Sequence, residues 1–123
     1  RCVMKILESA ENYLERILML QEKHGAVRSI DIAHALNFTK PSVSIAMKQL
    51  RENGYVTVDE GGHIALTQKG HAIAFRTYER HKVITELLVK LGVSPEAAHD
   101  DACRIEHDIS DESFRCMQEF LNK

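Results

Sequence analysis

At 123 residues the chain suits one compact domain, or a small domain with a helical extension, and is too short for two conventional domains. The 44% of apolar residues supports a buried core, and the net charge of −2 gives no global sign of nucleic-acid binding. No apolar run approaches the ~18 residues that span a bilayer, so we expect a cytoplasmic protein without membrane contact. Three widely spaced cysteines, Cys2, Cys103 and Cys116, argue against a disulfide scaffold and fit a reducing compartment.

Residues 5–24 predict an amphipathic helix, because apolar residues such as Leu14, Ile17 and Leu18 recur near helical spacing. Asn12 and Glu15 lie three positions apart on another side of this helix, within reach of a shared ligand. The helix is expected to end at His24 and Gly25.

A winged helix-turn-helix is predicted for the next segment. "SIDIAHAL" reads as a short helix with Ser29 as its cap, and "TKPSVSIAMKQLRENG" as a second helix capped by Thr39. The apolar spacing turns Val43 and Met47 inward and leaves Ser42, Ser44, Ile45 and Lys48 on or near the outer face. "YVTVDEGGHIALT" then has the alternation and glycine turn of a β-hairpin. Two short helices followed by a hairpin indicate a DNA-binding unit.

Residues from Thr67 to about Leu91 predict one long helix whose apolar surface is too extensive for a lone helix. We expect it to pack on the first helix and on a partner subunit. His81 lies midway along it, where a single histidine is either a packing residue or a ligand.

The stretch "HDDACRIEH" gathers two histidines, a cysteine and a glutamate. Ser94 and Pro95 predict a helix start, and a helix through His107 would place His99, Cys103, Glu106 and that histidine on one stripe. The stripe is either a metal site or a solvated polar face. Residues 94–112 carry seven acids against one base, which suits a cation, whereas residues 37–53 carry three bases against one acid, which suits an anion. Ser110 can cap a last helix.

With these elements placed, the sequence resembles the diphtheria toxin repressor and manganese-transport regulator family of metal-dependent repressors. The resemblance runs from "ENYLERILML" through "DIAHALNFTKPSVSIAMKQLRENGYV", "LTQKG" and "RHKVITELL" to "HDDACRIEHDIS". It implies a mainly α fold: a winged-helix DNA-binding domain at residues 1–71, then an all-helical dimerisation and metal-binding domain at residues 72–123. The chain is expected to lack the SH3-like domain of longer members.

The resemblance implies a set of metal ligands: Asn12, Glu15, His81, His99, Cys103, Glu106 and His107. Asn12 departs from the family pattern, in which a Met or Asp stands there, and a carboxamide should bind more weakly than a carboxylate. Thr85 stands where the iron branch has Glu, which puts a complete second site in doubt. The cofactor is expected to be Fe²⁺ or Mn²⁺, with Fe²⁺ favoured by Cys103 and His99, while Zn²⁺, Co²⁺ or Ni²⁺ can substitute in vitro.

The expected function is metal-activated repression of metal-ion homeostasis genes by a homodimer on double-stranded operator DNA, with no organic substrate. DNA contacts are predicted for six residues at or near the start of the second short helix: Thr39, Lys40, Pro41, Ser42, Ser44 and Lys48. The alternative is a winged-helix regulator that no longer senses metal. An enzyme with Cys103 as nucleophile and His107 as base lacks a recognisable orienting group, so we do not expect one.

Overall fold

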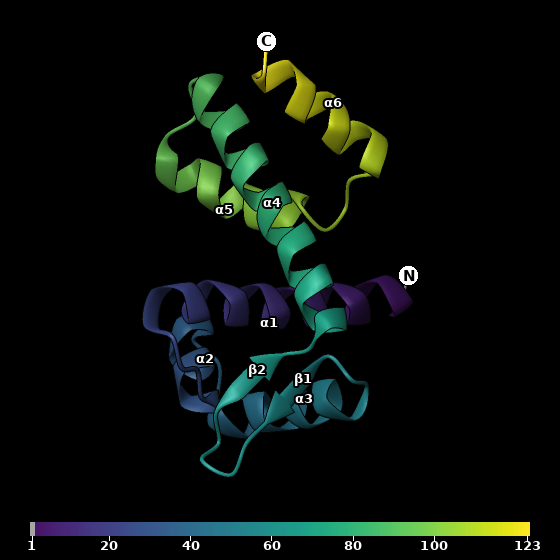
Figure 1. The fold of residues 1–123 in the computed structure, drawn as a ribbon. Coiled ribbons are helices and arrows are strands. Elements are labelled where there is room, and N and C mark those ends of the chain that lie inside the picture. Colours follow the sequence, from purple (N-terminus) through teal and green to yellow (C-terminus); the bar gives the residue numbers. More distant parts are fainter. Residues whose placement is uncertain (1) are drawn as a thin grey trace. The chain divides into compact units, whose positions relative to one another are not determined.

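The computed structural model describes residues 2–123, with side chains from Glu8 onward, and divides into two compact units, up to Phe75 and from Arg76 (Figure 1). The division falls within one continuous helix, α4 (Gln68–Lys90). Among the described residues, no helix has the length and apolarity needed to cross a bilayer.

The first unit is a winged helix-turn-helix, as predicted. It contains α1 (Cys2–His24), α2 (Ser29–Leu36), α3 (Lys40–Glu52), and an antiparallel hairpin of β1 (Val56–Val58) and β2 (Ile64–Leu66), which leads into the start of α4. Helix α1 packs on α2 and β2, while α3 packs on α2 and β1. The core is formed by buried apolar side chains from all of these elements: Leu14, Ile17, Ile32, Val43, Met47, Leu50, Val56 and Ile64.

Pairing of the hairpin with the residues before α2 determines where that helix begins. The N-cap of α2 is Arg28, not Ser29 as predicted, and the backbone N–H of Arg28 donates to Asp31 at 2.9 Å. The prediction was wrong because Arg28 is also bridged to His63 in antiparallel fashion, and the Ile64 N–H donates to Val27 at 2.7 Å. Pairing with the hairpin thus holds Arg28 extended, which is the backbone conformation that an N-cap adopts.

The second unit comprises the rest of α4, α5 (Pro95–Ile105) and α6 (Asp111–Leu121). The predicted caps are confirmed: the Ser94 hydroxyl accepts from the Ala97 N–H at 3.3 Å, and the Ser110 hydroxyl from the Ser113 N–H at 3.1 Å. Helix α5 ends at Ile105, two residues earlier than predicted, so Glu106 and His107 occupy the turn that follows. The described side chains of α6 all remain at least partly exposed, including those of its apolar edge.

Candidate metal centre and nucleic-acid interface

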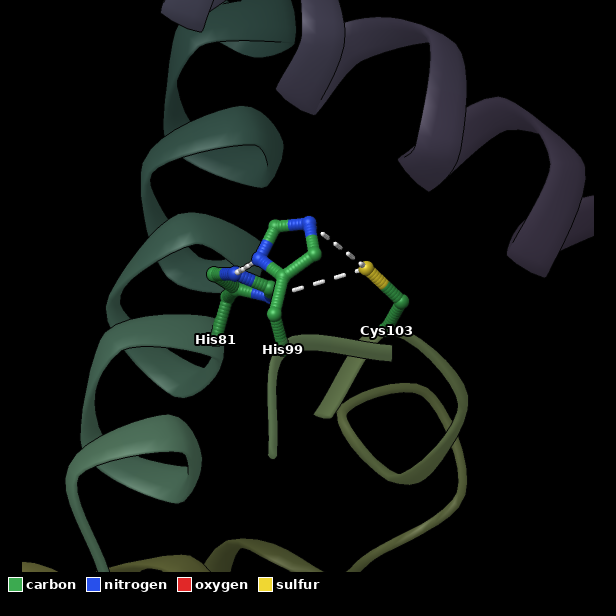
Figure 2. A group of neighbouring side chains, drawn as sticks. All are labelled: His81, His99 and Cys103. Atoms are coloured by element: carbon green, nitrogen blue, oxygen red, sulfur yellow. Dashed lines mark hydrogen bonds between the residues drawn. The ribbon is translucent and has the colours of Figure 1, made fainter. Parts of the chain in front are cut away.

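Three side chains of the second unit converge on one point (Figure 2). His81 comes from α4, and His99 and Cys103 come from successive turns of α5; one ligand atom from each lies within 4.8 Å of the others. His81 Nε2 is 3.0 Å from His99 Nδ1, and Cys103 Sγ is 3.8 Å from His81 Nδ1 and 3.9 Å from His99 Nε2. Helical periodicity explains the pair on α5, because residues four apart share a face. Two imidazoles and a thiol form a donor set that suits a borderline divalent transition metal.

Glu106 and His107 adjoin this group from the turn after α5. The Glu106 carboxylate is completely buried, with Oε2 3.1 Å from His81 Nδ1 and Oε1 3.5 Å from His107 Nε2. The His107 side chain is 1% exposed. A buried carboxylate beside neutral imidazoles would be costly, so this arrangement calls for a compensating positive charge.

A proton on His81 can supply that charge in the metal-free protein. The hydrogen bond with Cys103, followed by the hydrogen bond and charge of Glu106, raises the pKa of His81 to about 10 despite its burial. The imidazole therefore carries a proton at neutral pH. A divalent cation at the same atoms would replace this proton and satisfy the same carboxylate.

Thr85 does not extend the cluster. Its hydroxyl donates to the backbone carbonyl of His81 at 2.7 Å, one turn back along α4. Glu86, the next residue, is exposed. Within the second unit, His81, His99 and Cys103 meet within 4.8 Å, Glu106 contacts His81, and His107 contacts Glu106.

Asn12 and Glu15, the remaining predicted ligands, belong to the first unit. They lie three residues apart on α1, where Glu15 is buried at 6% exposure and Asn12 is half-buried. Residues at this spacing are neighbours on a helix surface. That their oxygens share a ligand stays a prediction.

The predicted DNA-contacting residues all lie at or near the N-terminal half of α3, and all six are exposed. The Thr39 hydroxyl caps the helix by accepting from the Ser42 N–H at 3.3 Å, and it also bonds the Ser42 hydroxyl at 2.8 Å. Burial of Val43, Met47 and Leu50 fixes the rotation of α3 and leaves Lys40, Ser44 and Lys48 facing solvent.

The tip of the hairpin is held by its own side chains. His63 donates its backbone N–H to Asp59 at 2.8 Å, its Nδ1 is 3.2 Å from the same carboxylate, and the Arg28 Nε donates to its Nε2 at 3.4 Å. These contacts give the hairpin a defined position beside α2.

Two further residues of these surfaces were not predicted as functional residues. Ile45 is 62% exposed on the outer face of α3, which is unusual for a large apolar side chain. Arg80, by contrast, is a buried charge beside His81 on α4. The exposed position of the first was predicted from the sequence, because the inward spacing of the other apolar residues leaves Ile45 outside. The burial of the second could not be predicted, because an arginine on a helix ordinarily faces water.

A winged-helix unit with an exposed cationic helix, joined to a helical unit that gathers imidazole, thiol and carboxylate groups, defines a metal-responsive DNA-binding regulator. The N-terminal DNA-binding domain of the iron-dependent repressors matches residues 5–64, and their metal-binding and dimerisation domain matches residues 67–123. The chain belongs to this family, the iron-dependent or diphtheria toxin repressor family, whose members bind operator DNA and dimerise.

Relatives of this chain include transcriptional regulators and an iron-dependent repressor. It is 35% identical over 118 residues to a helix-turn-helix-type transcriptional regulator of Methanocaldococcus jannaschii, covering 94% of each. It is 33% identical to the transcriptional regulator MntR of Escherichia coli, in a match that covers 94% of this chain and 75% of the relative. It is 31% identical to the iron-dependent repressor IdeR of Mycobacterium tuberculosis, in a match that covers 96% of this chain and 52% of the relative.

Among solved structures, the manganese regulator SloR superposes with a TM-score of 0.79 at 30% identity. The match covers 92% of this chain and 53% of SloR, so the chain spans about half the length of that regulator.

Proposed function

We propose that this chain is a metal-activated DNA-binding repressor that controls genes of metal-ion homeostasis, acting in the cytoplasm as a homodimer. The observation that carries the proposal is the convergence of His81, His99 and Cys103 within 4.8 Å in a chain whose other unit is a winged helix. Family membership supports both halves of the function. Residues 1–71 would be the DNA-binding domain and residues 72–123 the dimerisation and metal-binding domain.

Metal binding would be shared among side chains of several elements. His81, His99, Cys103, Glu106 and His107 would hold the ion in the second unit, and we propose that the α1 pair Asn12 and Glu15 supplies further ligands. A bound divalent cation supplies positive charge that neutralises the thiolate and carboxylates around it. Ligands drawn from different elements restrict how those elements move, and an arrangement that favours both metal and DNA makes each strengthen the binding of the other.

The donor set favours Fe²⁺ over Mn²⁺. A thiolate ligand such as Cys103 prefers the softer ion, whereas carboxylates such as Glu15 and Glu106 also suit Mn²⁺. Zn²⁺, Co²⁺ and Ni²⁺ should occupy the same atoms in vitro, because affinity for the same ligands generally rises along the series from Mn²⁺ toward Cu²⁺, and zinc also binds tightly. The useful measure is therefore activation of DNA binding at buffered metal concentration.

On DNA, α3 would enter the major groove. Its N-terminal residues Pro41, Ser42 and Ser44 would approach base edges, while Thr39, Lys40 and Lys48 would contact phosphates or flanking base edges. We also propose that Ile45 contacts a thymine methyl group, because apolar contact with that methyl is the major-groove interaction open to an aliphatic side chain. In a homodimer the two α3 helices would read half-sites about one helical turn apart, or a multiple of it.

The decisive experiment measures operator binding under anaerobic conditions, in chelator and in buffered Fe²⁺ or Mn²⁺, on DNA obtained by selection from random sequence. At least tenfold tighter binding with metal is expected, equivalent to about 1.4 kcal/mol of coupling. Equal affinity in chelator and in saturating metal would instead identify a winged-helix regulator that does not sense metal. Sedimentation of the same samples should give a dimer at micromolar concentration, and a monomer both free and on DNA would contradict the assembly proposed.

A further inference from the structure

Arg80, which precedes His81 on α4, places a charged group in the interior of the second unit. Only 4% of the residue is exposed. An arginine stays protonated at physiological pH, so burying its guanidinium costs free energy unless hydrogen bonds and a counter-charge compensate. A charge retained in such a position indicates a role that an apolar residue could not fill.

The partners of Arg80 come from the segment that joins α5 to α6 and from the first turn of α6. Its Nη1 donates to the backbone carbonyl of Glu106 at 3.1 Å and to that of Ile109 at 2.8 Å. Its Nη2 donates to the carboxylate of Asp111, the first residue of α6. The guanidinium carbon also lies 5.5 Å from the ring centroid of Phe114, in the first turn of α6. One side chain of α4 thus holds both ends of the connecting segment.

The charge of Arg80 offsets the partial negative charge at the C-terminal end of α5. The last carbonyls of a helix lack partners within the helix and carry the negative end of its dipole. Arg80 brings a donor, to the carbonyl of the C-cap residue Glu106, and a positive charge to this point. Hydrogen bonds from Arg76, and then from Arg80, lower the pKa of Asp111, so the carboxylate that completes the contact is ionised at neutral pH.

Glu106 is held at two points by consecutive residues of α4. Arg80 bonds its backbone carbonyl, and His81 Nδ1 lies 3.1 Å from its carboxylate Oε2. With the backbone of Glu106 fixed by one contact, the direction of its carboxylate toward the metal cluster is restricted. Because His107 follows Glu106 directly in the chain, the same contact restricts its backbone position.

We propose that Arg80 is a positioning residue for the metal site, which it serves by clamping the Glu106–Asp111 segment so that Glu106 faces His81 and His107 lies against Glu106. The inference rests on the proposed metal-binding function. Outer contacts of this kind matter because they orient the ligands, and their loss typically costs 10–100-fold in metal affinity. The clamp also ties the start of α6 to the ligand turn, so occupancy of the site and the placement of α6 are linked.

The test compares Arg80→Met, Arg80→Lys and the matched control Arg76→Met with the parent chain. Arg76 also bonds Asp111, at 3.2 Å, but its side chain is 56% exposed. Three quantities are measured: Co²⁺ affinity by competition with a chelator, the visible absorption spectrum of the Co²⁺-loaded protein, and thermal unfolding without metal. The spectrum reports ligand arrangement, which a loss of overall stability does not alter in protein that remains folded.

Arg80→Met is expected to bind Co²⁺ ten- to a hundredfold more weakly, with altered absorption bands, whereas Arg76→Met should match the parent. Arg80→Lys should fall between them, because an ammonium keeps the charge but cannot span three acceptors as the guanidinium does. Parental affinity and spectrum in folded Arg80→Met would overturn the inference. If that variant does not fold, parental behaviour of Arg80→Lys would overturn it instead. A parent chain that binds no Co²⁺ would refute the proposed function itself.

Discussion

Metal binding should depend steeply on pH, because the ion must displace a proton from His81. The pKa of about 10 lies three units above pH 7. At 1.36 kcal/mol per unit, proton competition weakens apparent metal affinity at pH 7 by about 4 kcal/mol, or roughly a thousandfold. The logarithm of the association constant should therefore rise by about one for each pH unit between pH 7 and 9, and by more if Cys103 also releases a proton.

Calorimetry of Co²⁺ binding in two buffers of different ionisation enthalpy counts the protons released, and at least one per ion is expected at pH 7. An NMR titration of the metal-free protein locates the His81 transition directly, with His81→Gln to assign the signal. The same proton stabilises the metal-free fold: because folding raises this pKa, the contribution is complete below about pH 6.5 and is lost as the pH rises through about 10. Affinity that stays constant from pH 7 to 9, or a His81 midpoint near 6.5, would refute the reasoning.

Three further changes have expected outcomes. Cys103→Ala should abolish or severely reduce activation of DNA binding by Fe²⁺, and Cys103→Glu should shift the metal preference toward Mn²⁺. A parental response of Cys103→Ala to both metals would exclude the thiol as a ligand. Lys40→Ala or Lys48→Ala should weaken binding to all DNA sequences and lower the slope of log affinity against log salt concentration by about one unit, whereas Lys48→Arg should keep the slope. An unchanged slope in an alanine variant would remove that lysine from the interface. Gly70→Ala should lower the unfolding midpoint of the chain markedly in thermal melts, because the added Cβ would lie 2.0 Å from the carbonyl oxygen of Tyr55; a parental midpoint would show that the backbone there yields easily.

Local signals in the sequence were sufficient for the order of the elements and for the class of fold. Thr39, Ser94 and Ser110 each precede a helix and accept a backbone N–H in its first turn, as predicted. Such caps act over three residues, so neighbours in the sequence determine them. The inward spacing of Val43, Met47 and Leu50 likewise determined which face of α3 is exposed.

Where two distant segments compete for one residue, local signals were insufficient. Ser29 was predicted as the cap of α2, but pairing of Arg28 with His63 moved the cap one position earlier. Helix α5 was predicted through His107, yet it ends at Ile105, where Arg80 offers an alternative partner for the carbonyl of Glu106. Arg80 and Glu106 are 26 positions apart, so the spacing of residues along either segment gives no sign of their contact.

The candidate metal site combines both kinds of information. The sequence by itself determined that His99 and Cys103 share a face of α5, because helix geometry places residues four apart side by side. Only the tertiary structure decided that His81 of α4 lies against both of them and against the carboxylate of Glu106. The physical reason is that helix packing, which depends on the burial of many side chains at once, sets which ligands meet, whereas the spacing along one helix sets only which ligands are presented together.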